Sequence, residues 1–181
     1  MTAVSSGYLA LGLLILRVIA GLTISAHGVQ KLFGWFDGNG FSGTVKMQER
    51  MGLKPAWVWA CLVIIGELGG GLSLALGLFT PLGAAGMIGA MFMAISKAHW
   101  KNGFFNSKRG LEFPLQLLSA AFVIGLIGPG SYSLDALLDI RLPSPLVFIV
   151  LVVAALVVDV VGLVMGRQPS AGRAEAAPTT S

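Results

Sequence analysis

Charged residues are scarce in this sequence. Only 11% of its 181 residues are Asp, Glu, Lys or Arg, whereas 55% are hydrophobic, and the mean hydropathy is +0.84. Soluble domains usually contain about 25% charged residues. The composition therefore excludes an ordinary soluble domain and predicts a chain that folds in lipid. The net charge is +4, but the basic residues lie beside apolar runs, where they orient membrane proteins, so no nucleic-acid partner is expected.

Cysteine and histidine are almost absent. One cysteine, Cys61, and two histidines occur in the whole chain. This excludes a disulfide framework, a Cys-x-x-Cys dithiol and a cysteine cluster for zinc or iron–sulfur, and no metal site is assigned. The loops leave no room for a soluble catalytic domain. The sequence shows no self-contained catalytic motif, and whether the chain is an oxidoreductase subunit stays open.

Long apolar runs dominate what is present. A membrane-spanning helix needs about 20 mostly apolar residues, and suitable runs occur at residues 8–26, 56–78, 82–98, 111–128 and 145–166. They predict an all-α membrane domain over residues 1–166, a four-helix transmembrane bundle with a fifth C-terminal transmembrane helix. Residues 167–181 are rich in Ala, Pro, Ser and Thr and are predicted to form a disordered cytoplasmic tail.

The basic residues predict an orientation. With five spans, the first loop, the third loop and the tail lie on one side and hold nearly all the basic residues outside the spans, whereas the opposite side holds Arg141. The positive-inside rule then places the N-terminus outside and the C-terminus in the cytoplasm of a multi-pass plasma-membrane protein.

Three ionisable residues fall inside the predicted spans: Arg17, Glu67 and Asp159. Such residues usually face the bundle interior and have a partner. Counting 1.5 Å per residue, Arg17 and Glu67 lie about 14 Å and about 16 Å below the outer ends of their helices. This match predicts a buried Arg17–Glu67 ion pair, although Glu67 could also carry a proton or bind a ligand. Asp159 is expected to pair with Lys97 or to extend toward the membrane surface.

His27 and His99 end the first and third runs on the same predicted side. They could meet there. Two imidazoles can ligate a haem or a metal, and one imidazole can hydrogen-bond a quinone carbonyl. The alternative is that they are separate interfacial residues beside Trp35 and Trp100.

Several motifs, in this order, resemble the DoxX family of bacterial membrane proteins over residues 10–128. They are His27 to Gly34 (HGVQKLFG), Met51 to Pro55 (MGLKP), Glu67 to Gly71 (ELGGG), Gly77 to Leu82 (GLFTPL) and His99 to Phe105 (HWKNGFF). The resemblance implies a four-helix membrane domain, which corresponds to the first four runs. The fifth run is an addition to that pattern.

The resemblance also implies a function. It indicates a redox-associated membrane subunit in a bacterial plasma membrane, linked to quinone electron transfer or to anchoring soluble redox enzymes at the cytoplasmic face. His27, Lys31, Glu67 and His99 occupy motif positions and are the candidate ligand or proton site. Quinone is the candidate cofactor, haem is disfavoured, and membrane lipid and a homo-oligomer remain candidate partners. The alternative function is a small-solute transporter or channel with a buried Arg–Glu pair.

Overall fold

The computed structural model describes residues 6–143 and 145–166, and every regular element in these ranges is helical. The main helices are α1 (Ser6–Phe33), α2 (Gly40–Arg50), α3 (Ala56–Ile64), α4 (Gly70–Leu76), α5 (Thr80–Ala94), α6 (Glu112–Ile127), α7 (Leu134–Leu137) and α8 (Leu146–Met165). Two π-helical turns, η1 (Ile65–Gly69) and η2 (Ile95–His99), and two 3-10 turns, η3 (Trp100–Asn102) and η4 (Asn106–Lys108), join them. The predicted all-α class is confirmed. The predicted tail lies outside the described residues.

Four helical segments are long and apolar enough to cross a membrane: Gly7–Phe33, Ala56–Leu76, Thr80–Asn102 and Leu146–Met165. The fourth apolar run forms α6, which has 16 residues. At 1.5 Å per residue, α6 is about 24 Å long, shorter than the roughly 30 Å hydrocarbon core of a bilayer. All five predicted runs are therefore helical within the described part of the chain, and α6 is shorter than the four continuous segments that could cross a membrane.

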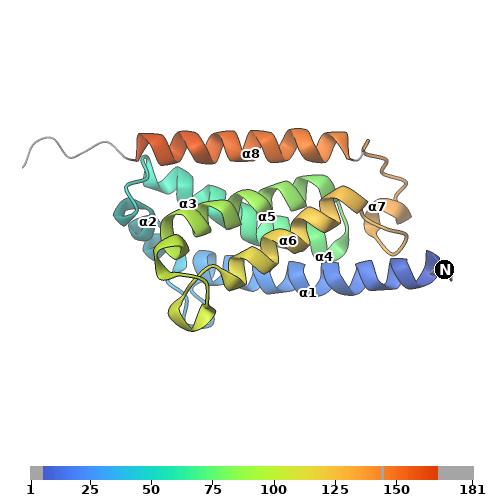
Figure 1. Ribbon diagram of the computed structural model, residues 1–181, viewed down its shortest axis with the longest axis horizontal. Coiled ribbons are helices and arrows are strands. Elements are labelled where there is room, and N and C mark those ends of the chain that lie inside the picture. The colour runs from blue at the N-terminus through green and yellow to red at the C-terminus, as the bar shows by residue number, and fades with distance from the viewer. Residues whose placement is uncertain (1–5, 144, 167–181) are drawn as a thin grey trace, which may run out of the picture.

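Helix α5 is the centre of the bundle. It packs against α4, η1, α6 and α8, and Met87 and Ile88 are among its fully buried side chains. Figure 1 shows α1 and α8 on opposite sides of the molecule with α5 between them. Because other helices surround α5, its apolar residues are buried on several faces, whereas α1 and α8 have many exposed apolar side chains. Such exposure is expected of helices that face lipid.

Helix α1 crosses the helix formed by α3, η1 and α4 at two close backbone contacts. A Cβ atom added to Gly21 would lie 2.5 Å from the backbone oxygen of Gly71, and one added to Gly28 would lie 2.5 Å from the backbone nitrogen of Leu68. Only glycine fits at such distances. Small residues of this kind allow membrane helices to approach closely, and here they bring α1 directly against η1.

The two ends of the bundle differ in their loops. Figure 1 shows α2 and the loop near residues 103–110 at the same end as the C-terminus of α8, whereas α7 and the N-terminus of α1 lie at the opposite end. Lys97 Nζ donates a hydrogen bond of 2.9 Å to the backbone oxygen of Met51, which ties η2 to the end of α2. The basic first and third loops therefore share one end, which is the condition that the predicted orientation requires.

Candidate functional site

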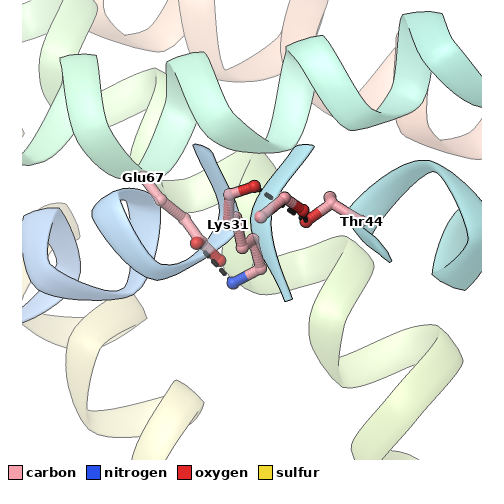
Figure 2. A network of polar contacts seen from close by, with 4 residues as sticks. Lys31, Thr44 and Glu67 are labelled. Atoms are coloured by element: carbon pink, nitrogen blue, oxygen red, sulfur yellow. Dashed lines mark hydrogen bonds and ion pairs between the residues drawn. The ribbon is translucent and has the colours of Figure 1, made fainter. Parts of the chain in front are cut away.

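A buried ion pair joins α1 to η1. Lys31 Nζ lies 2.5 Å from Glu67 Oε2, and the side chains are 22% and 3% exposed. Figure 2 shows the ammonium and the carboxylate pointing toward each other between the two helices. Two of the four predicted site residues are thus brought into direct contact. Lys31 reaches this position because α1 continues past residue 26 to Phe33, so the lysine is on the helix and not in a loop.

The π-helical turn η1 presents Glu67 to α1. Gly66 and Glu67 are both buried in this turn, yet a Cβ on Gly66 would meet the backbone oxygen of Gly86 on α5. Consecutive residues therefore face different neighbours. Single π-helical turns inside α-helices occur frequently at functional sites, and this one carries the only acidic residue of the segment Ala56–Leu76.

Thr44 of α2 holds the backbone of Lys31 from the other side. Its hydroxyl lies 3.0 Å from the backbone oxygen of Lys31 and 2.9 Å from that of Gly40, and the residue is fully buried. Figure 2 shows Thr44 on α2 approaching the C-terminal turn of α1. The sequence did not identify Thr44 as a site residue, because its role depends on a contact between α2 and the end of α1.

The predicted Arg17–Glu67 pair is wrong. Glu67 pairs with Lys31, and Arg17 Nη2 donates a hydrogen bond to the backbone oxygen of Tyr132. The guanidinium lies against Gly77, at the end of α4. Figure 1 shows that the N-terminal part of α1 projects beyond α4. Depths counted from the two helix ends are therefore not comparable, because the helices do not begin at the same level.

A second polar cluster surrounds Asp135 of the short helix α7. Its carboxylate accepts hydrogen bonds from Phe79 N at 2.8 Å, Thr80 N at 3.0 Å and Thr80 Oγ1 at 2.8 Å, and it attracts the Arg17 guanidinium electrostatically. Asp135 is 2% exposed. The sequence did not single it out, because it lies outside the apolar runs. The cluster caps the start of α5 and closes this end of the bundle.

The two histidines have separate partners. The His27 ring packs edge-on against Phe113 of α6, with 5.4 Å between ring centroids, and His27 precedes Lys31 by one helical turn. His99 Nδ1 lies 2.7 Å from the backbone oxygen of Arg109. His27 therefore belongs to the surroundings of the Lys31–Glu67 pair, whereas His99 organises the loop that follows η2.

The predicted pairing of Asp159 with Lys97 is also wrong. Lys97 bonds to the Met51 carbonyl. Asp159 is 7% exposed, and its Oδ2 atom has no hydrogen-bond partner in the part of the chain that the structure describes. Met51 directly follows α2, where backbone carbonyls lack partners within the helix, so Lys97 finds an acceptor there.

Together, the bundle and its buried charges define a multi-pass helical membrane protein with an internal polar site. The chain belongs to the DoxX family, whose model matches residues 12–100. It is 33% identical over 108 residues to the inner membrane protein YqjF of Escherichia coli (strain K12), covering 59% of this chain and 80% of that protein. No solved structure matches the chain. The family match includes Lys31 and Glu67, whereas Asp135 and Asp159 lie outside it.

Proposed function

We propose that this DoxX protein is a redox-associated subunit of the bacterial inner membrane. In this proposal, the Lys31 ammonium binds the carbonyl of a quinone, and the end of the bundle that carries the basic loops anchors soluble redox enzymes. The N-terminus then lies outside and the C-terminus in the cytoplasm, as the positive-inside rule requires. The name of the relative YqjF supports the inner membrane as the location.

The observation that carries the proposal is the Lys31–Glu67 pair. An ammonium has three N–H donors and no acceptor, and one of these donors is engaged by Glu67. The Lys31 side chain is 22% exposed, whereas the Glu67 side chain is almost fully buried. The lysine is thus the more exposed partner of the pair. A quinone carbonyl is an acceptor of the kind that Lys31 can bind, and His27 stands one helical turn away.

The anchoring part of the proposal rests on the surface at the same end. Large aromatic side chains are exposed there at the end of α1 and in the segments that follow α1 and η2: Phe33, Trp35, Phe36, Trp100, Phe104 and Phe105. Lysines and arginines accompany them in the sequence. Aromatic residues can mark the membrane interface, and they are also enriched where proteins bind each other. This combination suits a soluble partner that docks at the membrane surface.

The test is to purify the protein from bacterial membranes in mild detergent, extract bound lipids and quantify quinone per protein. We expect near-stoichiometric quinone in the wild type and a loss of at least fivefold in Lys31→Met/Glu67→Gln, which removes both charges together. The control is Lys108→Met, which removes an exposed lysine of η4 and should retain quinone. Absence of quinone from the wild type, or equal amounts in the double variant, would contradict the proposal. Co-purifying soluble enzymes, identified by mass spectrometry, test the anchoring part.

A small-solute transporter or channel is the second candidate function. One observation favours it: two of the candidate spans contain π-helical turns, η1 and η2, and η1 holds Glu67. Interrupted helices with a buried charge are common where transporters bind their substrates. Reconstituted liposomes distinguish the candidates, because transport predicts solute flux that Glu67→Gln abolishes and Asp139→Asn leaves unchanged.

A further inference from the structure

A cavity of about 680 Å³ lies on the opposite face of η1 from the ion pair. Its walls come from α3, η1 and α4 on one side, α5 on the second and α8 on the third, and it is partly open to the surroundings of the bundle. This volume falls within the range of small-molecule sites in proteins, roughly 300 to 1,000 Å³. Most of the lining is aliphatic or glycine, so the cavity suits an apolar molecule.

Glycines create part of this space. Gly66 and Gly70 face the backbone oxygens of Gly86 and Gly83, so η1 and α4 approach α5 backbone to backbone. Gly86 and Gly89 also line the cavity. A Cβ on Gly89 would lie 3.4 Å from Asp159 Oδ2, which places that carboxylate oxygen beside a bare stretch of α5.

Two polar residues that line the cavity, Gln48 and Asp159, each have a buried side-chain oxygen without a hydrogen-bond partner among the described residues. Gln48 is 3% exposed and Asp159 is 7% exposed, and Gln48 Oε1 and Asp159 Oδ2 form no hydrogen bond to any described residue. Gln48 belongs to α2, and Asp159 lies toward the end of α8. A Cβ on Gly52, just after α2, would lie 2.9 Å from the backbone oxygen of Gly166, just after α8. Both residues therefore lie toward the end of the bundle where α2 and the C-terminus of α8 meet.

The charge balance of the lining favours a cation. Asp159 is the one ionisable residue among the described residues that line the cavity. A buried polar group without a partner is destabilising, because it has lost its hydrogen bonds to water, and carboxylates inside membranes usually pair with a positive group. The expected protein partner, Lys97, is bonded to Met51 instead. A ligand can therefore supply both the missing hydrogen-bond donors and the missing positive charge.

We propose that this cavity binds a hydrophobic amine, whose apolar body fills the space between α4, α5 and α8 and whose ammonium group donates to Asp159 Oδ2 and Gln48 Oε1. A neutral alcohol supplies a donor but no charge, and a carboxylic acid is repelled by Asp159. The site is separate from the Lys31–Glu67 pair, since neither of those residues lines the cavity. It therefore goes beyond the quinone and anchoring functions proposed above.

Three fluorescent probes with one aromatic body test the head-group preference: 1-naphthylmethylamine, 1-naphthylmethanol and 1-naphthoate. Binding is measured by equilibrium dialysis against the full chain in phosphatidylcholine nanodiscs, with empty nanodiscs subtracted to remove partitioning into lipid. We expect saturable binding of the amine, at least tenfold weaker binding of the alcohol and none of the acid. Discs that contain phosphatidylethanolamine show whether a lipid amine occupies the site, because that head group then competes with the probe and phosphatidylcholine does not.

Variants tie the preference to the cavity. Asp159→Asn should weaken amine binding at least tenfold and bring it to the level of the alcohol, and Gln48→Leu should weaken it severalfold. Ala154→Phe adds bulk to the cavity wall at an exposed position and should reduce binding of both probes. The matched control is Asp139→Asn, which neutralises an exposed carboxylate paired with Arg141 and should leave binding unchanged. Equal binding of amine and alcohol, or amine binding that survives both Asp159→Asn and Ala154→Phe in folded protein, would overturn the proposal.

Discussion

The two halves of α1 accommodate buried positive charge in different ways. Lys31 meets a carboxylate directly, 2.5 Å from Glu67 Oε2. Arg17 bonds to the backbone oxygen of Tyr132, and its Nε and Nη1 atoms have no hydrogen-bond partner within residues 6–143 and 145–166. The nearby Asp135 attracts Arg17 electrostatically, but its carboxylate accepts hydrogen bonds from Phe79 and Thr80.

This difference shows what each charge is suited to do. In the lysine pair, each ion neutralises the other, so removal of one leaves a buried charge without compensation. In the arginine region, Arg17 and Asp135 form hydrogen bonds to different backbone groups. Each residue therefore keeps polar partners when the other is removed. The first arrangement concentrates polarity at one accessible point, whereas the second ties loops together at the end of the bundle.

The largest effect is expected from breaking the close contact between α1 and η1 beside the lysine pair. Gly28→Val would place side-chain atoms inside the backbone of Leu68, so α1 must move away from η1 and the lysine must leave Glu67. We expect little or no monodisperse protein in size-exclusion chromatography after detergent extraction. Gly12→Ala is the control on the same helix, because no atom lies within 4 Å of a Cβ there. A monodisperse Gly28→Val variant with wild-type melting behaviour would contradict the close contact.

The next largest loss of stability is expected from removing one partner of the Lys31–Glu67 pair. Lys31→Met leaves Glu67 buried and unpaired, which typically costs about 3–5 kcal/mol. The double variant Lys31→Met/Glu67→Gln removes both charges and should recover much of this loss, measured by thermal unfolding in detergent. If the single and double variants melt at the same temperature, the two side chains do not form a coupled pair.

A smaller loss is expected at the other end of α1. Arg17→Met removes the hydrogen bond to Tyr132 and the attraction to Asp135, whose three hydrogen bonds remain. We expect destabilisation of about 1–3 kcal/mol, with faster hydrogen exchange around Tyr132. As a reference, Asp139→Asn breaks an exposed ion pair and should cost under about 1 kcal/mol. A cost for Arg17→Met as large as that for Lys31→Met would remove the distinction between the two regions.

The helical architecture followed readily from the sequence, because long apolar runs with few charges permit few alternatives in lipid. The runs at 56–78 and 145–166 correspond closely to helices in the structure. The length of the first helix was underestimated. The polar residues Gln30 and Lys31 are typical of a loop, yet they lie in α1. The last turns of a membrane helix can contain a charged side chain such as Lys31 when a partner such as Glu67 forms an ion pair with it.

The partners of buried charges were harder to predict. Residue counting gave Arg17 and Glu67 similar depths, but it cannot reveal that α1 starts beyond the end of α4. Asp135 and Thr44 were missed because their roles arise from contacts with segments distant in sequence. The family resemblance selected Lys31 and Glu67 as site residues, whereas contact between them depends on Gly28 and on the geometry of η1.

The π-helical turn η1 also makes this stretch sensitive to chain length. Each residue of an α-helix advances the side-chain direction by about 100°, and η1 accommodates Glu67 toward α1 together with Gly66 toward α5. Deleting one residue between Ile65 and Gly69 would restore regular α-helical winding and shift the side chains of this turn relative to their neighbours. Gly70 and Gly71 could then no longer face α5 and α1 while Glu67 faces Lys31. Insertions and deletions should therefore be tolerated in the loops long before they are tolerated in these five residues.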